Sequence, residues 1–219
     1  MERKQGSATS ENDKDDFDVI YQDHLGGCAL AGDGATYYPV MWTHMIEKYN
    51  IKSMIDIGCG RAYSADYFKG SGVLSHGVEG CKEAVEKSFL ETDEVTLHDY
   101  ENDGPYVPEM VYDLGWSCEF VEHVTQENMQ NFIETFKRCK IVAITYAIPG
   151  QGGHHHVNEQ YEPYWIDHMN RNGFVLDTQG TGELRELAKQ DGQKYSPLYL
   201  SHFIRRGLLF VNKDFVEAA

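Results

Sequence analysis

Residues 54–62, which read MIDIGCGRA, have the composition of a ligand-binding turn at the end of a buried strand. The chemistry-bearing positions in this stretch are Asp56, Gly58, Cys59, Gly60 and Ala62. Glycines allow unusual backbone angles and a close approach of ligand to backbone. A helix that starts directly after the turn leaves N–H donors free. We therefore expect a strand, a sharp turn and a helix start beside a bound ligand; the alternative is an ordinary strand followed by a Gly-rich turn.

Acidic residues recur where later strands are expected to end. Glu79 and Gly80 close one apolar run, and Asp99 and Tyr100 follow the next. Residues 113–124, DLGWSCEFVEHV, contribute a further set of polar side chains: Ser117, Glu119, Glu122 and His123. Because open α/β sheets bind ligands at the carboxyl ends of their strands, we expect these positions to gather at one edge.

Histidines supply candidate proton acceptors. The first is His123, and the others form a run in the polar loop 149–158: His154, His155 and His156. A hydroxyl or protonated amine that reacts as a nucleophile must lose a proton, and histidine is the usual acceptor. The alternatives are that His123 only caps or packs, and that the run is a surface cluster.

The elements that position these side chains follow from the apolar pattern. Strands are expected at 53–57, 73–79, 95–97, 110–114, 140–147, 173–177 and 207–211, and helices at 39–49, 63–68, 82–90, 128–139 and 162–171. This alternation predicts a mostly parallel sheet with helices on both faces. Because residues 180–200 have no readable pattern, the last two strands lack an obvious long helix between them, which favours an antiparallel last strand.

The chain divides into four parts. Residues 1–16 are expected to be a disordered tail, 17–52 an N-terminal lid and helix, 53–212 the main domain and 213–219 a C-terminal tail. The Gly-rich, aromatic stretch 17–39 either folds over a ligand or packs on the outside.

Composition excludes several classes of function. The 19 basic and 35 acidic residues give a formal charge of −16, which speaks against broad binding of nucleic acids or anionic membranes. No apolar run approaches a membrane span, and the polar N-terminus is no signal peptide. Five cysteines without a CxxC pair fit reduced thiols better than disulfides or a zinc site. Without a membrane span or a signal peptide, we expect a cytoplasmic protein. The acidic charge favours a small-molecule partner.

With these elements in this order, the chain resembles the class I S-adenosylmethionine-dependent methyltransferases over roughly residues 36–212. That family's first turn reads D-x-G-x-G-x-G, and here Ala62 replaces the last glycine. A dinucleotide fingerprint would instead need Gly or Ala where Tyr63 stands. Residues 117–124 are similar to the [S/C]-x-E-[V/I]-x-E-H-[V/L] element of many small-molecule methyltransferases.

The resemblance implies a Rossmann-like seven-stranded sheet that binds S-adenosylmethionine. Glu79 would accept the ribose hydroxyls, Asp99 the adenine amino group, and Tyr100 would stack on the purine. Asp56 would meet the methionine end or order the turn. The full cofactor-binding set implied is Asp56, Gly58, Cys59, Gly60, Ala62, Glu79, Gly80, Asp99, Tyr100, Ser117 and Glu119.

The function implied is methyl transfer to a small-molecule acceptor, with oxygen favoured over nitrogen. The alternatives are methylation of a protein or peptide side chain, and an idle fold kept as a binding module. Similar ubiquinone-pathway O-methyltransferases are linked to a divalent metal through acids of the 117–124 element. A helix would put Glu119 and His123 on one face with Glu122 adjacent. Since no third firm ligand is evident and three consecutive histidines make a poor zinc site, we assign no metal.

Overall fold

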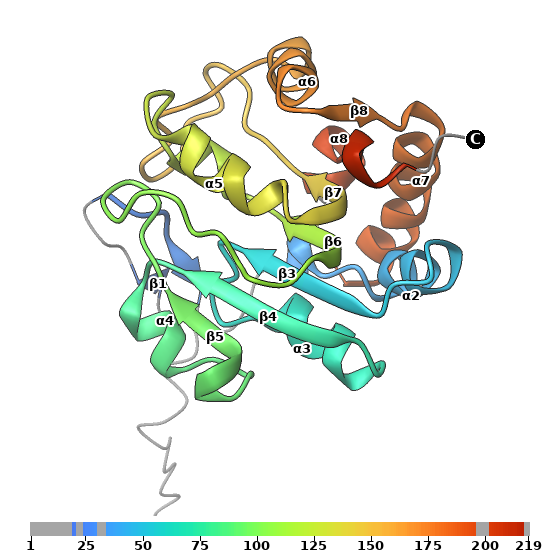
Figure 1. Ribbon diagram of the computed structural model, residues 1–219, viewed down its shortest axis with the longest axis horizontal. Coiled ribbons are helices and arrows are strands. Elements are labelled where there is room, and N and C mark those ends of the chain that lie inside the picture. The colour runs from blue at the N-terminus through green and yellow to red at the C-terminus, as the bar shows by residue number, and fades with distance from the viewer. Residues whose placement is uncertain (1–18, 21–23, 30–33, 196–201, 217–219) are drawn as a thin grey trace, which may run out of the picture.

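The computed structural model describes residues 19–20, 24–29, 34–195 and 202–216, and there the chain alternates strands with helices (Figure 1). The strands are β1 (Val19–Ile20), β2 (Cys28–Ala29), β3 (Ser53–Ile57), β4 (Leu74–Glu79), β5 (Val95–Leu97), β6 (Tyr112–Ser117), β7 (Cys139–Ile144), β8 (Phe174–Leu176) and β9 (Leu208–Asn212). The α-helices are α2 (Pro39–Lys48), α3 (Tyr63–Gly70), α4 (Lys82–Glu86), α5 (Met129–Phe136), α6 (Glu162–Arg171), α7 (Thr178–Tyr195) and α8 (His202–Arg206). Short 3-10 turns are η1 (Gly34–Thr36), η2 (Thr92–Glu94), η3 (Val121–His123) and η4 (Lys213–Phe215).

Seven strands form one sheet in the order β5-β4-β3-β6-β7-β9-β8. The five strands from β5 to β7 pair in parallel, whereas β9 runs antiparallel to both β7 and β8. The predicted α/β fold, with a mostly parallel sheet and an antiparallel last strand, is confirmed. The strand order reverses at β3, because β4 lies on one side of it and β6 lies on the other. In open α/β sheets, a crevice forms at such a switch point, outside the carboxyl ends of the strands.

Helices cover both faces of the sheet, and each face has its own apolar core. In Figure 1, α5 and α6 lie above the sheet and α3 and α4 lie below it. Side chains alternate along β3, so Met54 packs into the core with α2, α3 and α7, and Ile55 packs into the core with α5 and α6. This two-sided burial explains why all five residues of β3 are buried and why the strand reads as an apolar run.

The strand expected at 110–114 begins and ends later, as β6. Its last residues pair with β3, with Gly115 opposite Ile55 and Trp116 opposite Asp56. A Cβ on Gly115 would lie 2.9 Å from the sulfur of Cys139. The glycine therefore marks a close packing contact within the strand and not a turn after it.

The stretch without a readable pattern holds most of α7, an 18-residue helix between β8 and β9. The expectation that no long helix separates the last two strands is therefore wrong. Two other helices are shorter than expected. α4 ends at Glu86, after which the N–H of Phe89 bonds the carbonyl of Arg61, and α5 ends at Phe136, three residues before β7 begins.

The expected tails are only partly described. Residues 1–16 lie outside the described residues, as do 217–219. The first residues after β9 form η4, which Asn212 caps by accepting a hydrogen bond from the N–H of Asp214 at 3.1 Å. Among the described residues, no helix combines the length and the apolar character needed to span a bilayer.

Candidate functional site

A cleft of about 640 Å³, its opening to solvent included, lies at the carboxyl ends of the parallel strands. Four segments of the main domain and one N-terminal segment line it. The lining residues are Leu25, Gly26, Gly27, Gly58, Gly60, Val78, Glu79, Gly80, His98, Asp99, Tyr100, Glu101, Glu119, Phe120, His123 and Val124. The cleft therefore stands at the sheet edge where the acidic positions were expected to gather.

The turn after β3 is held in an unusual backbone conformation. Gly58, Gly60 and Ala62 all have positive φ, at 72°, 54° and 64°. A Cβ on Gly58 would lie 2.4 Å from the ring of Phe120, so only glycine fits there. Ala62 is fully buried and packs into the core, which offsets the roughly 1 kcal/mol that a left-handed conformation costs alanine. Small size is therefore only part of what this position requires.

Two residues of the expected cofactor set support the turn from behind and do not line the cleft. The side chain of Asp56 is buried and accepts a hydrogen bond from the hydroxyl of Ser64 at the start of α3. Burial raises its pKa to about 7, the charge of Glu79 adds to this, and the Ser64 hydrogen bond opposes it. Cys59 packs its sulfur against Gly77. Asp56 thus orders the turn, one of the two roles expected for it.

Glu79 joins two turns at the edge of the cleft. One carboxylate oxygen accepts the N–H of Gly60 at 2.7 Å, and the other accepts the N–H of Cys81 at 2.8 Å. Burial raises the pKa of Glu79, while these backbone donors counteract the rise. Beside it, a Cβ on Gly80 would lie 3.0 Å from Leu25, so the N-terminal segment passes directly over this glycine.

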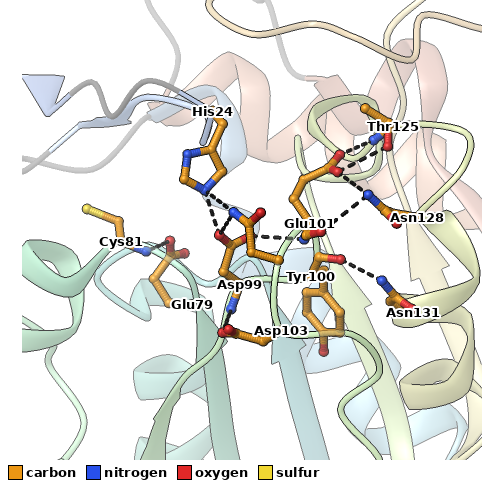
Figure 2. A network of polar contacts seen from close by, with 11 residues as sticks. His24, Glu79, Cys81, Asp99, Tyr100, Glu101, Asp103, Thr125, Asn128 and Asn131 are labelled. Carbon is orange, nitrogen blue, oxygen red and sulfur yellow. Dashed lines mark hydrogen bonds and ion pairs between the residues drawn. The ribbon is translucent and has the colours of Figure 1, made fainter.

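Asp99 is contacted by a histidine from the N-terminal segment. Figure 2 shows His24 above Asp99. The Nε2 of His24 lies 2.5 Å from one oxygen of the Asp99 carboxylate, and Asn102 donates to the same oxygen at 2.7 Å. Burial alone would raise the pKa of Asp99, but the hydrogen bonds from His24 and Asn102 hold it below its usual value. The carboxylate of Asp99 therefore stays charged at the mouth of the cleft.

Tyr100 borders the cleft but is largely buried, so its stacking on a ligand stays a prediction. Its side chain is only 3% exposed and its hydroxyl forms a 2.8 Å hydrogen bond with Thr135. The ring packs edge-on against Phe120 and Phe132, and Figure 2 shows it pointing away from His24. Tyr100 borders the cleft but serves the core beneath it.

Ser117 has a structural position, whereas Glu119 faces the cleft. Ser117 is 1% exposed, does not line the cleft, and donates to the carbonyl of Ile57 at 3.0 Å, tying β6 to β3. Glu119 does line the cleft, and its two oxygens contact the Thr145 hydroxyl and the Nδ1 of His202, each at 2.8 Å. Burial would raise the pKa of Glu119, but His202 holds it below its usual value.

The helical arrangement expected for the 119–123 stretch is wrong. Glu119 has a positive φ of 54°, and only Val121–His123 form a single 3-10 turn, η3. Glu119 and His123 therefore do not share a helix face. Glu119 is instead turned toward Thr145 and His202.

Among the four candidate histidines, His123 lines the cleft. Its Nδ1 donates to the carbonyl of His155 at 3.2 Å, and its ring meets that of His156 edge-on, with centroids 4.9 Å apart. Burial lowers the pKa of His123 to about 4, and the charge of His156 adds to this. His154 and His155 are not among the lining residues.

Some residues of the site were not expected from the sequence. His24 and Leu25 come from the N-terminal segment, and nothing in the sequence marks them individually. The structure also groups Glu122, His123 and His156, whose potential metal-ligating atoms all lie within 4.8 Å of one another. The sequence shows these three side chains but not that the loop after β7 folds back onto η3.

Comparisons with known proteins identify the fold. The sequence matches no model of a protein family and no curated protein. Among solved structures, magnesium protoporphyrin IX methyltransferase from Synechocystis PCC 6803 with bound SAM has a TM-score of 0.53 at 14% identity, covering 79% of this chain and 76% of that one. The plantazolicin methyltransferase BpumL, in complex with a triazolic desmethylPZN analog and SAH, has a TM-score of 0.56 at 12% identity, covering 80% and 83%.

A third similar structure is an O-methyltransferase from a trans-AT PKS multienzyme of Brevibacillus brevis in complex with S-adenosyl-L-homocysteine. Its TM-score is 0.51 at 11% identity, covering 81% of this chain and 72% of that one. Identities this low relate the folds and leave the activity to be argued from the cleft.

Proposed function

We propose that this chain, which has the fold of class I S-adenosylmethionine-dependent methyltransferases, binds S-adenosylmethionine and methylates a small-molecule acceptor, with oxygen favoured over nitrogen. The observation that carries the proposal is the convergence of Gly58, Gly60, Glu79 and Asp99 on one cleft at the carboxyl ends of the parallel strands. The names of the similar proteins, which concern magnesium protoporphyrin IX and plantazolicin, support a small-molecule acceptor.

The lining residues fit this cofactor. Glu79 accepts two backbone N–H groups, yet a carboxylate offers about four lone-pair sites, so it can also accept ribose hydroxyls. Asp99 can accept the adenine amino group at the site where His24 now bonds it. An acidic rim suits the positive charge of a sulfonium ion. The positive-φ glycines let the backbone approach the ligand closely.

The protein's contribution would be mainly positional. The cofactor supplies a methyl group that is already activated. The residues of the cleft must hold the acceptor in line with it and exclude water, and such positioning supplies much of the acceleration. The segment that contains Leu25, Gly26 and Gly27 forms one wall of the cleft, which suits a small enclosed acceptor.

A proton acceptor is harder to assign. His123 is the only one of the four predicted histidines that lines the cleft, but a pKa near 4 makes it a weak base at neutral pH. The involvement of His154, His155 or His156 stays a prediction. Glu119 borders the cleft with both oxygens already engaged by Thr145 and His202.

Calorimetric titration with S-adenosylhomocysteine tests the proposal. Replacing Glu79 by Gln should weaken binding about 10- to 100-fold, the effect of losing charged hydrogen bonds. Glu86→Gln on α4 is the matched control, because Glu86 is exposed, is not among the residues that line the cleft, and forms an ion pair with exposed Lys82. Absence of binding to well-folded protein, judged by circular dichroism, would overturn the cofactor assignment. An assay with labelled cofactor and a metabolite panel then tests the acceptor class. The proposal of a small-molecule acceptor is wrong if label enters only proteins or peptides.

A further inference from the structure

The acidic side chains of the cleft are divided between its two ends. Glu79, Asp99 and Glu101 lie at or after the ends of β4 and β5. Glu119 follows β6, on the other side of β3. Within the described chain, no lysine or arginine is among the residues that line the cleft. The β6 end of the cleft therefore has one carboxylate and no lysine or arginine to neutralise it.

Glu119 is held in one orientation by contacts with two other elements. Its N–H donates to the hydroxyl oxygen of Thr145 at 2.7 Å, and that hydroxyl donates in return to one carboxylate oxygen at 2.8 Å. The Nδ1 of His202, at the start of α8, lies 2.8 Å from the other carboxylate oxygen. These contacts hold a backbone with a positive φ of 54°, which is unfavourable for a residue with a Cβ. Strain of this kind persists only where the surroundings impose it, and it is common at functional sites.

Of two neighbouring carboxyl groups, Glu119 is the one that carries a charge. Burial would raise the pKa of Glu119, but the hydrogen bond from His202 holds it below its usual value. Glu122 is fully buried without a hydrogen-bond partner in the described chain, and burial together with the charge of Glu119 raises its pKa. Since burial favours the neutral form of a carboxyl group, Glu119 depends on its donors to stay ionised. His202 therefore helps to fix where the negative charge lies.

The order of the strands places this charge beyond the ribose end of the cleft. The proposed function puts adenine at Asp99, after β5, and the ribose at Glu79, at the end of β4. Neighbouring strands lie about 4.8 Å apart, so the same direction continues over β3 to Glu119 after β6. In S-adenosylmethionine the sulfonium is bonded to the ribose on the side away from adenine. That half of the cofactor is thus directed toward Glu119.

We propose that His202, acting through Glu119, positions a negative charge beside the sulfonium of S-adenosylmethionine and so strengthens the binding of this cation relative to neutral S-adenosylhomocysteine. Since the cofactor and its direction are those of the proposed function, the inference rests on that function. His202 is not among the lining residues, so it is a positioning residue and Glu119 makes the contact. Because the sulfur loses its charge during methyl transfer, the attraction favours exchange of product for cofactor and not the chemical step.

Calorimetric titration of the full chain with S-adenosylmethionine and, separately, with S-adenosylhomocysteine tests the role of the charge. Glu119→Gln keeps the shape of the side chain and removes its charge. It should weaken binding of S-adenosylmethionine about 10- to 100-fold, as expected for the loss of a partly screened charge pair. The affinity for S-adenosylhomocysteine should stay within about twofold. Glu86→Gln on α4, outside the cleft, removes the same unit of charge and should change neither affinity.

Two variants of His202 test its part. His202→Leu removes the hydrogen-bond donor, whereas His202→Asn supplies an amide N–H in place of the Nδ1 donor. Leucine should lower the ratio of the two affinities about 10-fold, the effect of losing a hydrogen bond to a charged group. Asparagine should bring the ratio back to within about twofold of the parent. A purely structural role of His202 would instead weaken the binding of both ligands together.

The outcomes separate this inference from the proposed function. An unchanged ratio in Glu119→Gln, or equal losses for both ligands, would overturn the inference and leave the cofactor assignment intact. Failure of His202→Asn to restore the ratio would remove His202 from it. Binding of neither ligand to the well-folded parent would overturn the proposed function itself. If His202→Leu does not fold, as judged by circular dichroism, Glu119→Gln decides.

Discussion

Three acidic side chains show how differently single residues accommodate charge in this fold. Glu79 is satisfied by backbone N–H donors and remains available to the cleft. Among the described residues, Asp56 has a serine hydroxyl and no cation beside it, so burial dominates and its pKa rises to about 7. Glu122 has neither kind of partner within the described chain. The three environments differ in the partners that they supply: backbone N–H groups for Glu79, a hydroxyl for Asp56, and no hydrogen-bond partner within the described chain for the Glu122 carboxylate.

Asp56 should make stability depend on pH. Its pKa is about 7 in the folded protein and 3.8 in an unfolded chain, so the unfolded state loses the proton first as pH rises. The free energy of unfolding should therefore fall as pH rises through this window and level off above it. Asp56→Asn should remove that fall, about 4 kcal/mol between the two limits. Urea denaturation of both proteins across this pH range measures it, and parallel profiles would contradict it.

Among the elements, α7 shows how two similar glycines can have opposite requirements. A Cβ on Gly180 would lie 2.3 Å from the carboxylate of Asp177 and 2.7 Å from the hydroxyl of Tyr49, whereas a Cβ on Gly182 would meet nothing within 4 Å. The N–H of Gly180 also donates to Asp177 at 2.8 Å, at the start of the helix. Gly180 is required for packing, and Gly182 is only a weak point in the helix.

Alanine substitution should separate the two glycines. Gly182→Ala should stabilise the protein by about 0.5–1 kcal/mol, because glycine is a poor helix former in an exposed position. Gly180→Ala should destabilise it by about 1–3 kcal/mol through steric overlap at a crowded site. Chemical denaturation of the pair checks both signs. Equal shifts in the same direction would show that local packing around Gly180 does not control this helix.

The periodicity of apolar residues predicted most helices and strands. The features that it did not predict depend on contacts between residues far apart in the sequence. β3 and α6 occupy the residues expected for them, because an apolar run and a three- and four-residue repeat are local signals. α7 was not predicted from the sequence, because its glycines and charged residues interrupt the apolar periodicity of a helix. In the site, the glycines and acids at strand ends could be predicted from the sequence. The contact of His24 with Asp99 and the proximity of Glu122 to His156 could not, because they arise from loops that fold back across long sequence separations.

For the whole molecule, acidity is the dominant electrostatic property. A formal charge of −16 means that repulsion between like charges opposes the compact state. Exposed ion pairs such as Lys82–Glu86 and Arg171–Asp167 offset little of it, since each such pair contributes less than about 1 kcal/mol. Net repulsion should therefore outweigh local attraction.

Salt should stabilise this protein. Raising NaCl from about 20 mM to about 500 mM shortens the screening length from roughly 20 Å to roughly 4 Å, which weakens long-range repulsion more than short contacts. We expect the free energy of unfolding to rise by about 1 kcal/mol, as measured by urea denaturation at neutral pH. KCl serves as the control for ion-specific effects. A decrease in both salts would mean that local ion pairs outweigh the net charge.

The position of β9 has a consequence for the order in which the chain assembles. Among the strands that the structure describes, β8 has no neighbour in the sheet except β9, although β8 precedes it by more than 30 residues. During synthesis, β8 must therefore emerge from the ribosome and wait unpaired until β9 inserts between it and β7. Such non-local pairing is slow, and an exposed strand edge invites association with other chains in the meantime. Premature termination before β9 should thus yield aggregates and not a smaller folded domain.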